Sequence, residues 1–112
     1  MASAGRAEQA IGLYHAFADG DREFVERVLA DEFTFFSPVD VGLDRAGYFE
    51  RCWPGAGQGQ RFDFLRLVES GDDVIVTYEM TRADGGRGRN TEVLTFSGDR
   101  ITRAEVYFGW NV

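Results

Sequence analysis

One glutamate stands in an otherwise apolar alternation near the C-terminus. Between residues 91 and 96 the even positions are Glu92, Leu94 and Phe96. Residues two apart in a strand share a face, so we expect the Glu92 carboxyl to lie among apolar side chains. Such a carboxyl loses hydration, which raises its pKa unless it is paired. Glu92 is therefore the candidate catalytic residue, as a general acid or base or as a donor to a ligand oxygen. The alternative is a structural hydrogen bond or ion pair, with Arg45, Arg82 or Asn90 as the partner.

Aromatic and apolar side chains predict a pocket around this glutamate. Tyr78 and Trp53 offer a hydroxyl and an indole N–H, each on a body that can be buried against a ligand. The predicted ligand-binding residues are Tyr14, Trp53, Tyr78, Met80, Leu94 and Phe108. The alternative for each of them is ordinary core packing. The expected ligand is a small apolar molecule.

Other reactive side chains do not form a recognisable site. With one histidine, His15, and one cysteine, Cys52, the chain lacks the usual zinc ligand sets and an intramolecular disulfide. We expect His15 at the edge of a helix and Cys52 as a buried, inert thiol. Asp40 and Asp44 carry no further ligand pattern, and a loop carboxylate and a helix N-cap account for them. No metal and no cofactor are expected.

Length and charge restrict the classes of function. The chain has 112 residues, which suits a single domain over residues 1–112, and hydrophobic residues make up 44% of it. Its net charge of -7 argues against binding to nucleic acid or to anionic membranes. No apolar run approaches the roughly 20 residues of a membrane span. We therefore expect a cytoplasmic protein without a membrane segment.

The pattern of elements predicts an α+β fold. Helical spacing covers residues 6–18 and 22–30, and Asp44 can cap a third helix that ends at Pro54. A short strand is expected at residues 33–36. Four longer strands follow, at residues 62–68, 74–81, 91–96 and 101–110. Helices gathered on one face of a mostly antiparallel sheet are the economical packing for this order.

Burial predicts the pairing of the strands. If the apolar sets share the helix-covered face, even residues must pair with even residues, because a shift of one residue reverses every side chain. Glu92 then shares a face with Tyr78 and Met80. On the last strand the inward set is Ala104, Val106, Phe108 and Trp110, and the outward set is Ile101, Arg103, Glu105 and Tyr107. The outward face contains aromatic residues and suits a partner surface.

Several local strings, in their order and spacing, resemble the nuclear-transport-factor-2-like (NTF2-like) superfamily, in its SnoaL-like branch. The matching segments are Ala18–Asp21, Leu29–Phe33, Phe36–Pro38, Asp44–Phe49 and Gly98–Ile101. The resemblance implies a cystatin-like cone, in which a curved, mostly antiparallel sheet wraps around three N-terminal helices and an apolar pocket. It also implies a homodimer through the outer sheet face. Members include ketosteroid isomerases, polyketide cyclases and non-catalytic binding domains, so the fold does not select a function.

The isomerase pattern is only partly present. The general-base aspartate that precedes a proline in those enzymes corresponds to Ser37 here, and a neutral hydroxyl is no base at pH 7. Their oxyanion-hole tyrosine falls on Leu13 in a gap-free match, with Tyr14 one position away. Their second acid corresponds to Glu92. This resemblance therefore disfavours isomerase chemistry by that mechanism.

Two hypotheses remain. In the first, the protein binds or processes a small apolar carbonyl or hydroxyl compound, with Glu92 as the polar centre. In the second, it is a non-catalytic binding or dimerisation module whose pocket is filled by side chains. A cavity of more than about 300 Å³ beside Glu92 would favour the first hypothesis.

Overall fold

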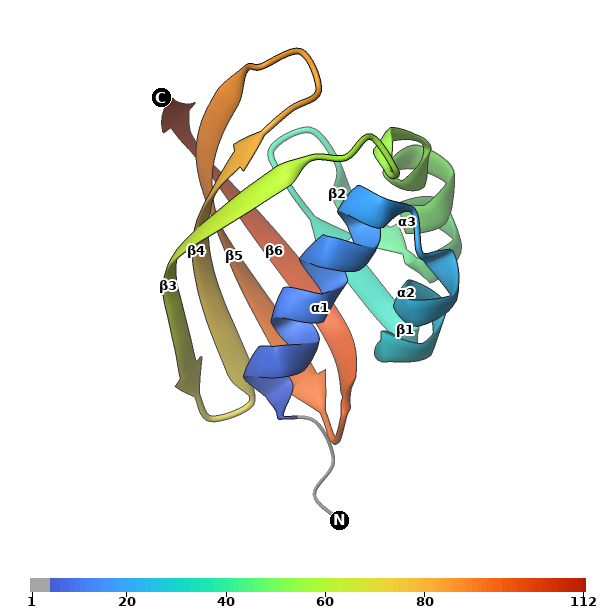
Figure 1. Cartoon of the computed structure of the whole chain (residues 1–112). Coiled ribbons are helices and arrows are strands. Elements are labelled where there is room, and N and C mark those ends of the chain that lie inside the picture. Colours follow the sequence, from blue (N-terminus) through green and yellow to red (C-terminus); the bar gives the residue numbers. More distant parts are fainter. Residues whose placement is uncertain (1–4) are drawn as a thin grey trace.

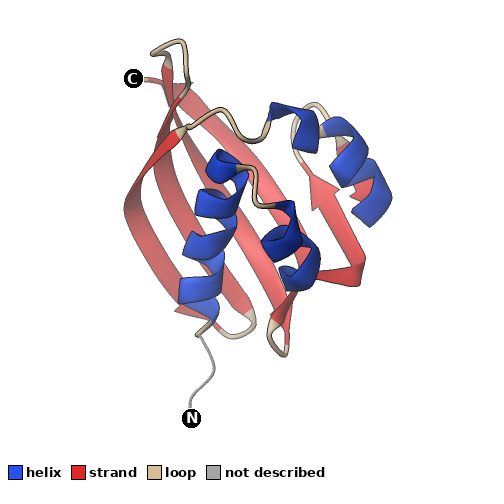
Figure 2. Cartoon of the chain, turned by 45° about the vertical axis from the view of Figure 1, so that its right-hand side comes forward, coloured by secondary structure: helices blue, strands red, loops and turns tan. Residues whose placement is uncertain are grey.

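The computed structural model describes residues 5–112, which form one six-stranded sheet with its helices on one face (Figures 1 and 2). The helices are α1 (Arg6–Asp19), α2 (Arg22–Val28) and α3 (Arg45–Arg51), followed by a short 3-10 helix, η1 (Trp53–Gly55). The strands are β1 (Leu29–Phe36), β2 (Val41–Asp44), β3 (Arg61–Ser70), β4 (Asp73–Thr81), β5 (Arg87–Ser97) and β6 (Arg100–Asn111). The predicted α+β class and the three helices are confirmed.

Capping side chains set the starts of the two short helices. The Asp21 carboxylate accepts a hydrogen bond from the Phe24 N–H at 3.2 Å, and Asp44 accepts one from the Gly47 N–H at 2.7 Å. Helix α1 ends at Gly20, whose φ of 74° is readily adopted only by glycine. These signals are local in sequence, which is why the beginnings of the helices were predictable.

The sheet has the order β2-β1-β6-β5-β4-β3, and only the β1–β6 pair is parallel. The long strands curve around α1, which lies in the hollow of the sheet (Figure 1). The predicted even-with-even pairing of β4 and β5 is confirmed, since Val76 pairs with Glu92 and Val74 with Leu94. Glu92 therefore shares the helix-covered face with Tyr78 and Met80.

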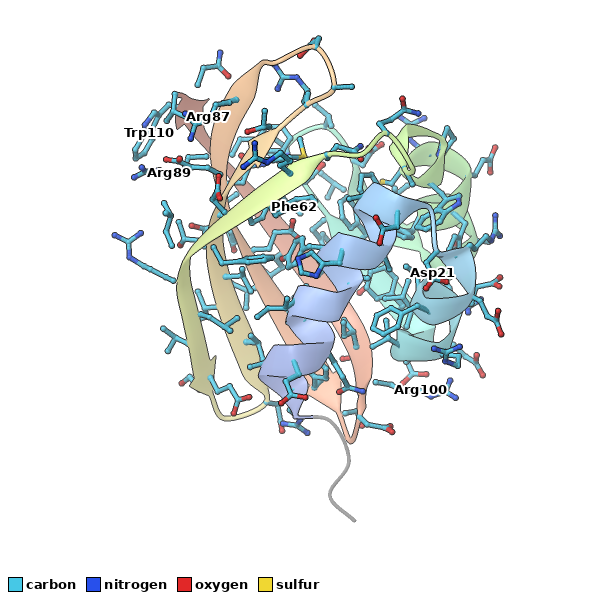
Figure 3. The ribbon with its side chains drawn as sticks, viewed as in Figure 1. Asp21, Phe62, Arg87, Arg89, Arg100 and Trp110 are labelled. Atoms are coloured by element: carbon cyan, nitrogen blue, oxygen red, sulfur yellow. The ribbon has the colours of Figure 1, made fainter. Side chains whose placement is uncertain are left out.

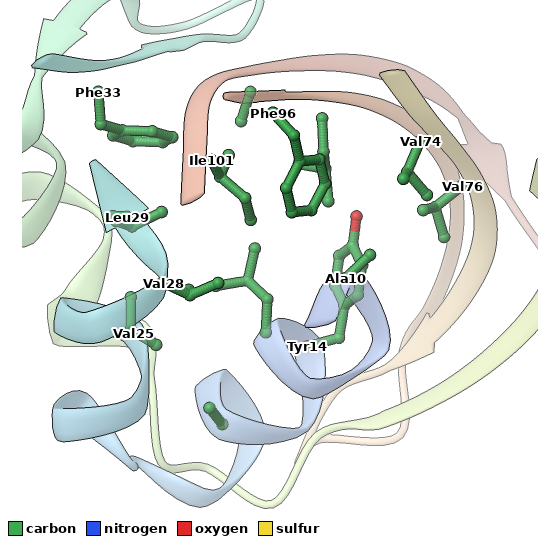
Figure 4. Close-up of a cluster of buried hydrophobic side chains, with 14 of the residues drawn as sticks. Ala10, Tyr14, Val25, Val28, Leu29, Phe33, Val74, Val76, Phe96 and Ile101 are labelled. Atoms are coloured by element: carbon green, nitrogen blue, oxygen red, sulfur yellow. The ribbon is translucent and has the colours of Figure 1, made fainter. Parts of the chain in front are cut away.

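The core fills the space between α1, α2 and the lower part of the sheet (Figure 4). Val25, Val74, Val76, Leu94 and Ile101 are completely inaccessible to solvent. Burying such side chains contributes about 1.5–3 kcal/mol each. The core also includes the buried rings of Tyr14, Tyr48 and Tyr78, so it extends up to the cavity described below.

Three predicted boundaries were wrong. The second helix stops at Val28, and β1 begins at Leu29 instead of Phe33, because Leu29 pairs with Ile101 of β6. Strand β2 was not expected. Strand β5 begins at Arg87, four residues before the predicted start at residue 91. In each case pairing with another strand overrode the pattern of residue types; the partner of Leu29 is distant in the chain, whereas those of β2 and of the start of β5 lie on the strand that precedes each of them.

Two residues of β6 face the opposite way from the prediction. A register shift beside Phe96 turns Ile101 into the core, where it is completely buried. A second shift near Gly109 turns Trp110 outwards, where the Arg89 guanidinium lies 5.2 Å from its ring centroid (Figure 3). An extra residue in one strand inverts the alternation beyond it, and strict alternation cannot anticipate this.

No helix in residues 5–112 is long and apolar enough to cross a membrane.

Candidate functional site

An apolar cavity of about 230 Å³ lies between α1, the end of α3, strand β1 and strands β3 to β6. Most of its lining is aromatic or aliphatic, and the polar atoms come from Tyr14, Tyr48, Cys52, Tyr78, Asn90 and Glu92. The remaining lining residues are Leu13, Phe17, Phe35, Phe62, Met80, Val106 and Phe108. A concave, mostly apolar space with a few polar groups is the usual form of a small-molecule site. Its volume is smaller than the roughly 300 Å³ that would have favoured the first hypothesis, a protein that binds or processes a small molecule.

The Glu92 carboxylate is held by Tyr78. The hydroxyl of Tyr78 donates a hydrogen bond to Glu92 Oε2 at 2.6 Å. This contact crosses from β4 to β5 at positions offset by two residues, because Glu92 pairs with Val76 and Tyr78 with Asn90. The partners considered from sequence, Arg45 and Arg82, do not contact Glu92, and no ion pair involves this carboxylate among residues 5–112.

Burial raises the pKa of Glu92 from 4.5 to about 7, because the ionised form loses water that the cavity wall does not replace. Hydrogen bonding from Tyr78 and a weaker interaction with the Tyr14 hydroxyl oppose this shift. At neutral pH the carboxyl is therefore divided between its acid and its ionised forms. Such a group can both donate and accept a proton near pH 7.

The Tyr14 hydroxyl is a buried donor beside Glu92. It is buried and has no hydrogen-bond partner of acceptable geometry among residues 5–112. Figure 4 shows the side chain rising from α1 towards the sheet. The ring packs 5.1 Å from that of Tyr78 and 5.4 Å from that of Phe62. Burial and the nearby Glu92 raise the pKa of Tyr14 far above its usual value, so the hydroxyl keeps its proton.

Asn90 completes a chain of hydrogen bonds that ends at Glu92. Its side-chain carbonyl accepts from the Gly109 N–H at 3.4 Å, and its amide group donates to the Tyr78 oxygen at 3.4 Å. Because the Tyr78 oxygen accepts this bond, its own proton points to Glu92. The Tyr78 hydroxyl thus already donates and accepts a hydrogen bond within the protein. Tyr14 and the carboxyl of Glu92 can still form hydrogen bonds with a ligand.

The predicted site residues divide into two groups. Tyr14, Tyr78, Met80, Glu92 and Phe108 line the cavity. Trp53 and Leu94 do not line it, which corrects their predicted position. The ring of Trp53, in η1, packs against Phe17 of α1 and Phe49 of α3. Leu94 is completely buried in the core.

Sequence reasoning missed part of the lining. Tyr48, Phe62 and Phe35 were not predicted to line a pocket, Cys52 was expected to be a buried thiol, and Asn90 was considered only as a partner of Glu92. The thiol of Cys52 lines the cavity, and burial raises its pKa to about 11, so it stays protonated at neutral pH. The expected inert thiol is therefore partly accessible.

Two other candidates are accounted for by local structure. The Ser37 hydroxyl accepts hydrogen bonds from the backbone N–H groups of Val39, at 3.3 Å, and Asp40, at 3.1 Å, and it does not line the cavity. It shapes the turn between β1 and β2. His15 is exposed on α1, beside Phe64. Within the described part of the chain, no three histidine, cysteine or acidic residues are grouped as for a metal ion.

The curved sheet with three helices on one face has the NTF2-like fold, and its hollow holds the cavity with Tyr78 and Glu92. The family model for the SnoaL-like domain matches residues 10–104, so the chain belongs to the SnoaL-like domain family. No curated protein matches the sequence at a significant level.

Solved structures of several bacterial proteins share the fold. An NTF2-like protein of unknown function from Cytophaga hutchinsonii is 17% identical with a TM-score of 0.78, over 96% of this chain and 93% of that one. A proposed polyketide cyclase from Acidithiobacillus ferrooxidans is 24% identical with a TM-score of 0.74, over 95% and 89%. A proposed ketosteroid isomerase from Kribbella flavida is 17% identical with a TM-score of 0.78, over 93% and 77%. At these identities the similarity establishes the fold alone.

Proposed function

We propose that the cavity binds a small apolar molecule that carries a carbonyl or hydroxyl oxygen, and that Tyr14 and Glu92 contact this oxygen. The observation that carries the proposal is the unpartnered, buried Tyr14 hydroxyl beside a carboxyl with a pKa of about 7, both in an apolar cavity. Leaving a buried donor unpaired costs about 1–3 kcal/mol. A ligand oxygen that accepts from Tyr14 recovers that cost.

The volume limits the size of the ligand. A dry apolar cavity of about 150 Å³ accommodates benzene, so a cavity of about 230 Å³ suits a substituted single ring. If the bound molecule reacts, Glu92 is the group with a pKa suited to moving a proton at neutral pH. Isomerase chemistry with a base at position 37 stays disfavoured, because the Ser37 hydroxyl accepts hydrogen bonds from the N–H groups of Val39 and Asp40 in the turn.

A pair of matched ligands tests the proposal. Acetophenone and α-methylstyrene have nearly the same shape, but the first has a carbonyl oxygen where the second has a methylene group. At pH 6 we expect acetophenone to bind about 5- to 30-fold more tightly, which corresponds to one or two net hydrogen bonds. Binding is measured by ligand-observed NMR and calorimetry. Equal affinities, or no binding of either compound, would contradict the proposal.

Replacing Tyr14 with phenylalanine should separate stability from recognition. The ring still fills its place on α1, and the unpartnered hydroxyl disappears, so the free energy of unfolding should be unchanged or higher. The preference for acetophenone over α-methylstyrene should fall several-fold. Tyr107→Phe, which removes a hydroxyl from an exposed tyrosine outside the cavity, is the control and should keep the preference. An unaltered preference in Tyr14→Phe would remove Tyr14 from the site.

We further propose that the protein forms a homodimer through the outer face of the sheet. Tyr107 and Trp110 are 55% and 62% exposed on this face, while the polar Thr77 and Glu79 are shielded beside them. Large exposed apolar side chains on one face favour association. The resemblance to other members of the superfamily points to the same face.

A charge at Tyr107 should dissociate such a dimer. We expect the wild-type protein to elute as a dimer in size-exclusion chromatography with light scattering, and Tyr107→Glu to elute as a monomer. The new carboxylate would lie next to Glu105, which now accepts the Tyr107 hydroxyl at 2.9 Å, and would be desolvated in the interface. Val39→Glu, at an exposed position between β1 and β2, is the control. A monomeric wild type would exclude this assembly.

A further inference from the structure

Two depressions adjoin the cavity at the end of the cone near the β4–β5 hairpin, which rises at the top of Figure 1. The first, of about 350 Å³, lies towards the end of β6, and it shares Met80, Asn90 and Phe108 with the cavity. The second, of about 430 Å³, lies towards β3 and shares Phe17 and Met80 with the cavity. Because Met80 lines all three spaces and each depression shares at least one further side chain with the cavity, we refer to the two depressions as the mouth of the cavity.

Arg82 is the only basic residue among those described that line the cavity or its mouth, and it lines both depressions. Its side chain is 49% exposed. Its one ion pair is long, with Nε 3.6 Å from Asp84 Oδ1, and its guanidinium donates no hydrogen bond within residues 5–112. A guanidinium has five N–H donors, so this one has capacity for a further acceptor.

The hairpin turn positions the guanidinium. The Arg82 N–H donates to the Gly86 carbonyl at 2.8 Å, and the Gly86 N–H donates to Asp84 Oδ1 at 2.8 Å. The Arg82 guanidinium packs over Gly86, in the space that a Cβ atom would fill. The absence of a side chain at residue 86 therefore allows Arg82 to lie against its own turn.

The chemistry of the mouth differs from that of the cavity. Besides Arg82, its polar side chains include the amides of Gln58, Gln60 and Asn111, and its one acidic group is Asp84. An anion buried in the apolar cavity would be costly, but at the mouth it meets a guanidinium and remains partly hydrated. Arginine recognises carboxylates by paired N–H bonds.

We propose that Arg82 binds a carboxylate of the ligand, so that the ligand is an apolar ring with a neutral oxygen at the closed end and a carboxylate at the mouth. The inference rests on the proposed function of the cavity and adds the substrate class. It assigns Arg82 the role of discriminating acids from their neutral analogues. Asp84 competes with the ligand for the same guanidinium.

Two ligands that differ in charge test this inference. 4-Acetylbenzoate and 4-acetylbenzamide share the ring and the acetyl group, and only the first carries a charge at neutral pH. We expect the wild-type protein to prefer the benzoate by about fivefold at low ionic strength, as for a partly exposed ion pair. The preference should shrink as salt is added.

Three variants should give three different results for the preference for the benzoate. Arg82→Gln should abolish the preference without changing the affinity for the benzamide. Asp84→Asn keeps an acceptor for the Gly86 N–H but removes the competing charge, so it should increase the preference. Arg87→Gln, on the same hairpin but ion-paired with Glu79 at 2.8 Å, should leave it unchanged. Affinities are measured by calorimetry.

The outcomes distinguish this inference from the proposed function. Binding of acetophenone and the benzamide without a preference for the benzoate would overturn the role of Arg82 alone. A preference that persists in Arg82→Gln, or that falls equally in Arg87→Gln, would also overturn it. If none of the three compounds binds, both proposals fail.

Discussion

Replacing Glu92 with glutamine should make the protein more stable at pH 8 and leave it nearly unchanged at pH 4.5. Burial raises the pKa of this carboxyl from 4.5 to about 7 in the folded state. The folded protein therefore binds more protons than the unfolded chain between these pH values, so the wild type loses stability as pH rises through this window. The full loss is at most about 3 kcal/mol, and water in the cavity reduces it.

The measurement is the difference in unfolding free energy between wild type and Glu92→Gln, from chemical denaturation at several pH values. All other ionisable groups are common to both proteins, so their contributions cancel in the difference. Glu50→Gln, on the exposed surface of α3, is the control and should give a flat difference. A flat difference for Glu92→Gln between pH 4.5 and pH 8 would show that the carboxyl is hydrated as in water.

The same titration predicts the pH dependence of binding. A protonated Glu92 can donate to a carbonyl oxygen, whereas the ionised form repels it. The affinity of the wild type for acetophenone should therefore fall as pH rises through about 7. Glu92→Gln keeps an N–H donor at every pH, so its affinity should be independent of pH over this range.

Truncating Leu94 to alanine should lower the free energy of unfolding far more than truncating Met80. Leu94 is completely buried between Val74 on β4 and Ala104 on β6. Leu94→Ala should therefore lower the free energy of unfolding by about 2–5 kcal/mol. Met80 is partly buried and lines the cavity and its mouth, so Met80→Ala should cost less and should weaken acetophenone binding.

Urea denaturation and calorimetry at a temperature where both variants are folded check this contrast. If Leu94→Ala kept its stability and lost binding, Leu94 would belong to the ligand site as the sequence suggested. If Met80→Ala bound acetophenone as the wild type does, the ligand would lie deeper than Met80.

Local patterns were sufficient for much of the architecture. Helix caps such as Asp21 and Asp44 act on N–H groups three residues away, so they can be read from short strings. The face of Glu92 was also predictable, because one apolar face in each of β4 and β5 admits only one parity of pairing. The α+β class and the inward direction of this carboxyl were therefore determined by the sequence itself.

How deep a residue lies within the cone could not be predicted from local patterns. Leu94 and Glu92 share a face, but α1 and the core cover Leu94 and leave Glu92 beside the cavity. Whether an inward residue lines a hollow or fills the core depends on where α1 crosses the curved sheet. Trp53 was misplaced for the same reason, since η1 turns its ring against Phe17.

The tertiary structure alone decided which groups meet. Tyr14 lies far from Tyr78 and Glu92 along the chain, and no local pattern relates the three. The two register shifts in β6 inverted Ile101 and Trp110, because an extra residue costs little locally and is selected by packing of the whole sheet. Periodicity depends on neighbours in the chain and fixes a residue's face, whereas a buried hydrogen-bonding site depends on distances between strands and helices that only the folded chain sets.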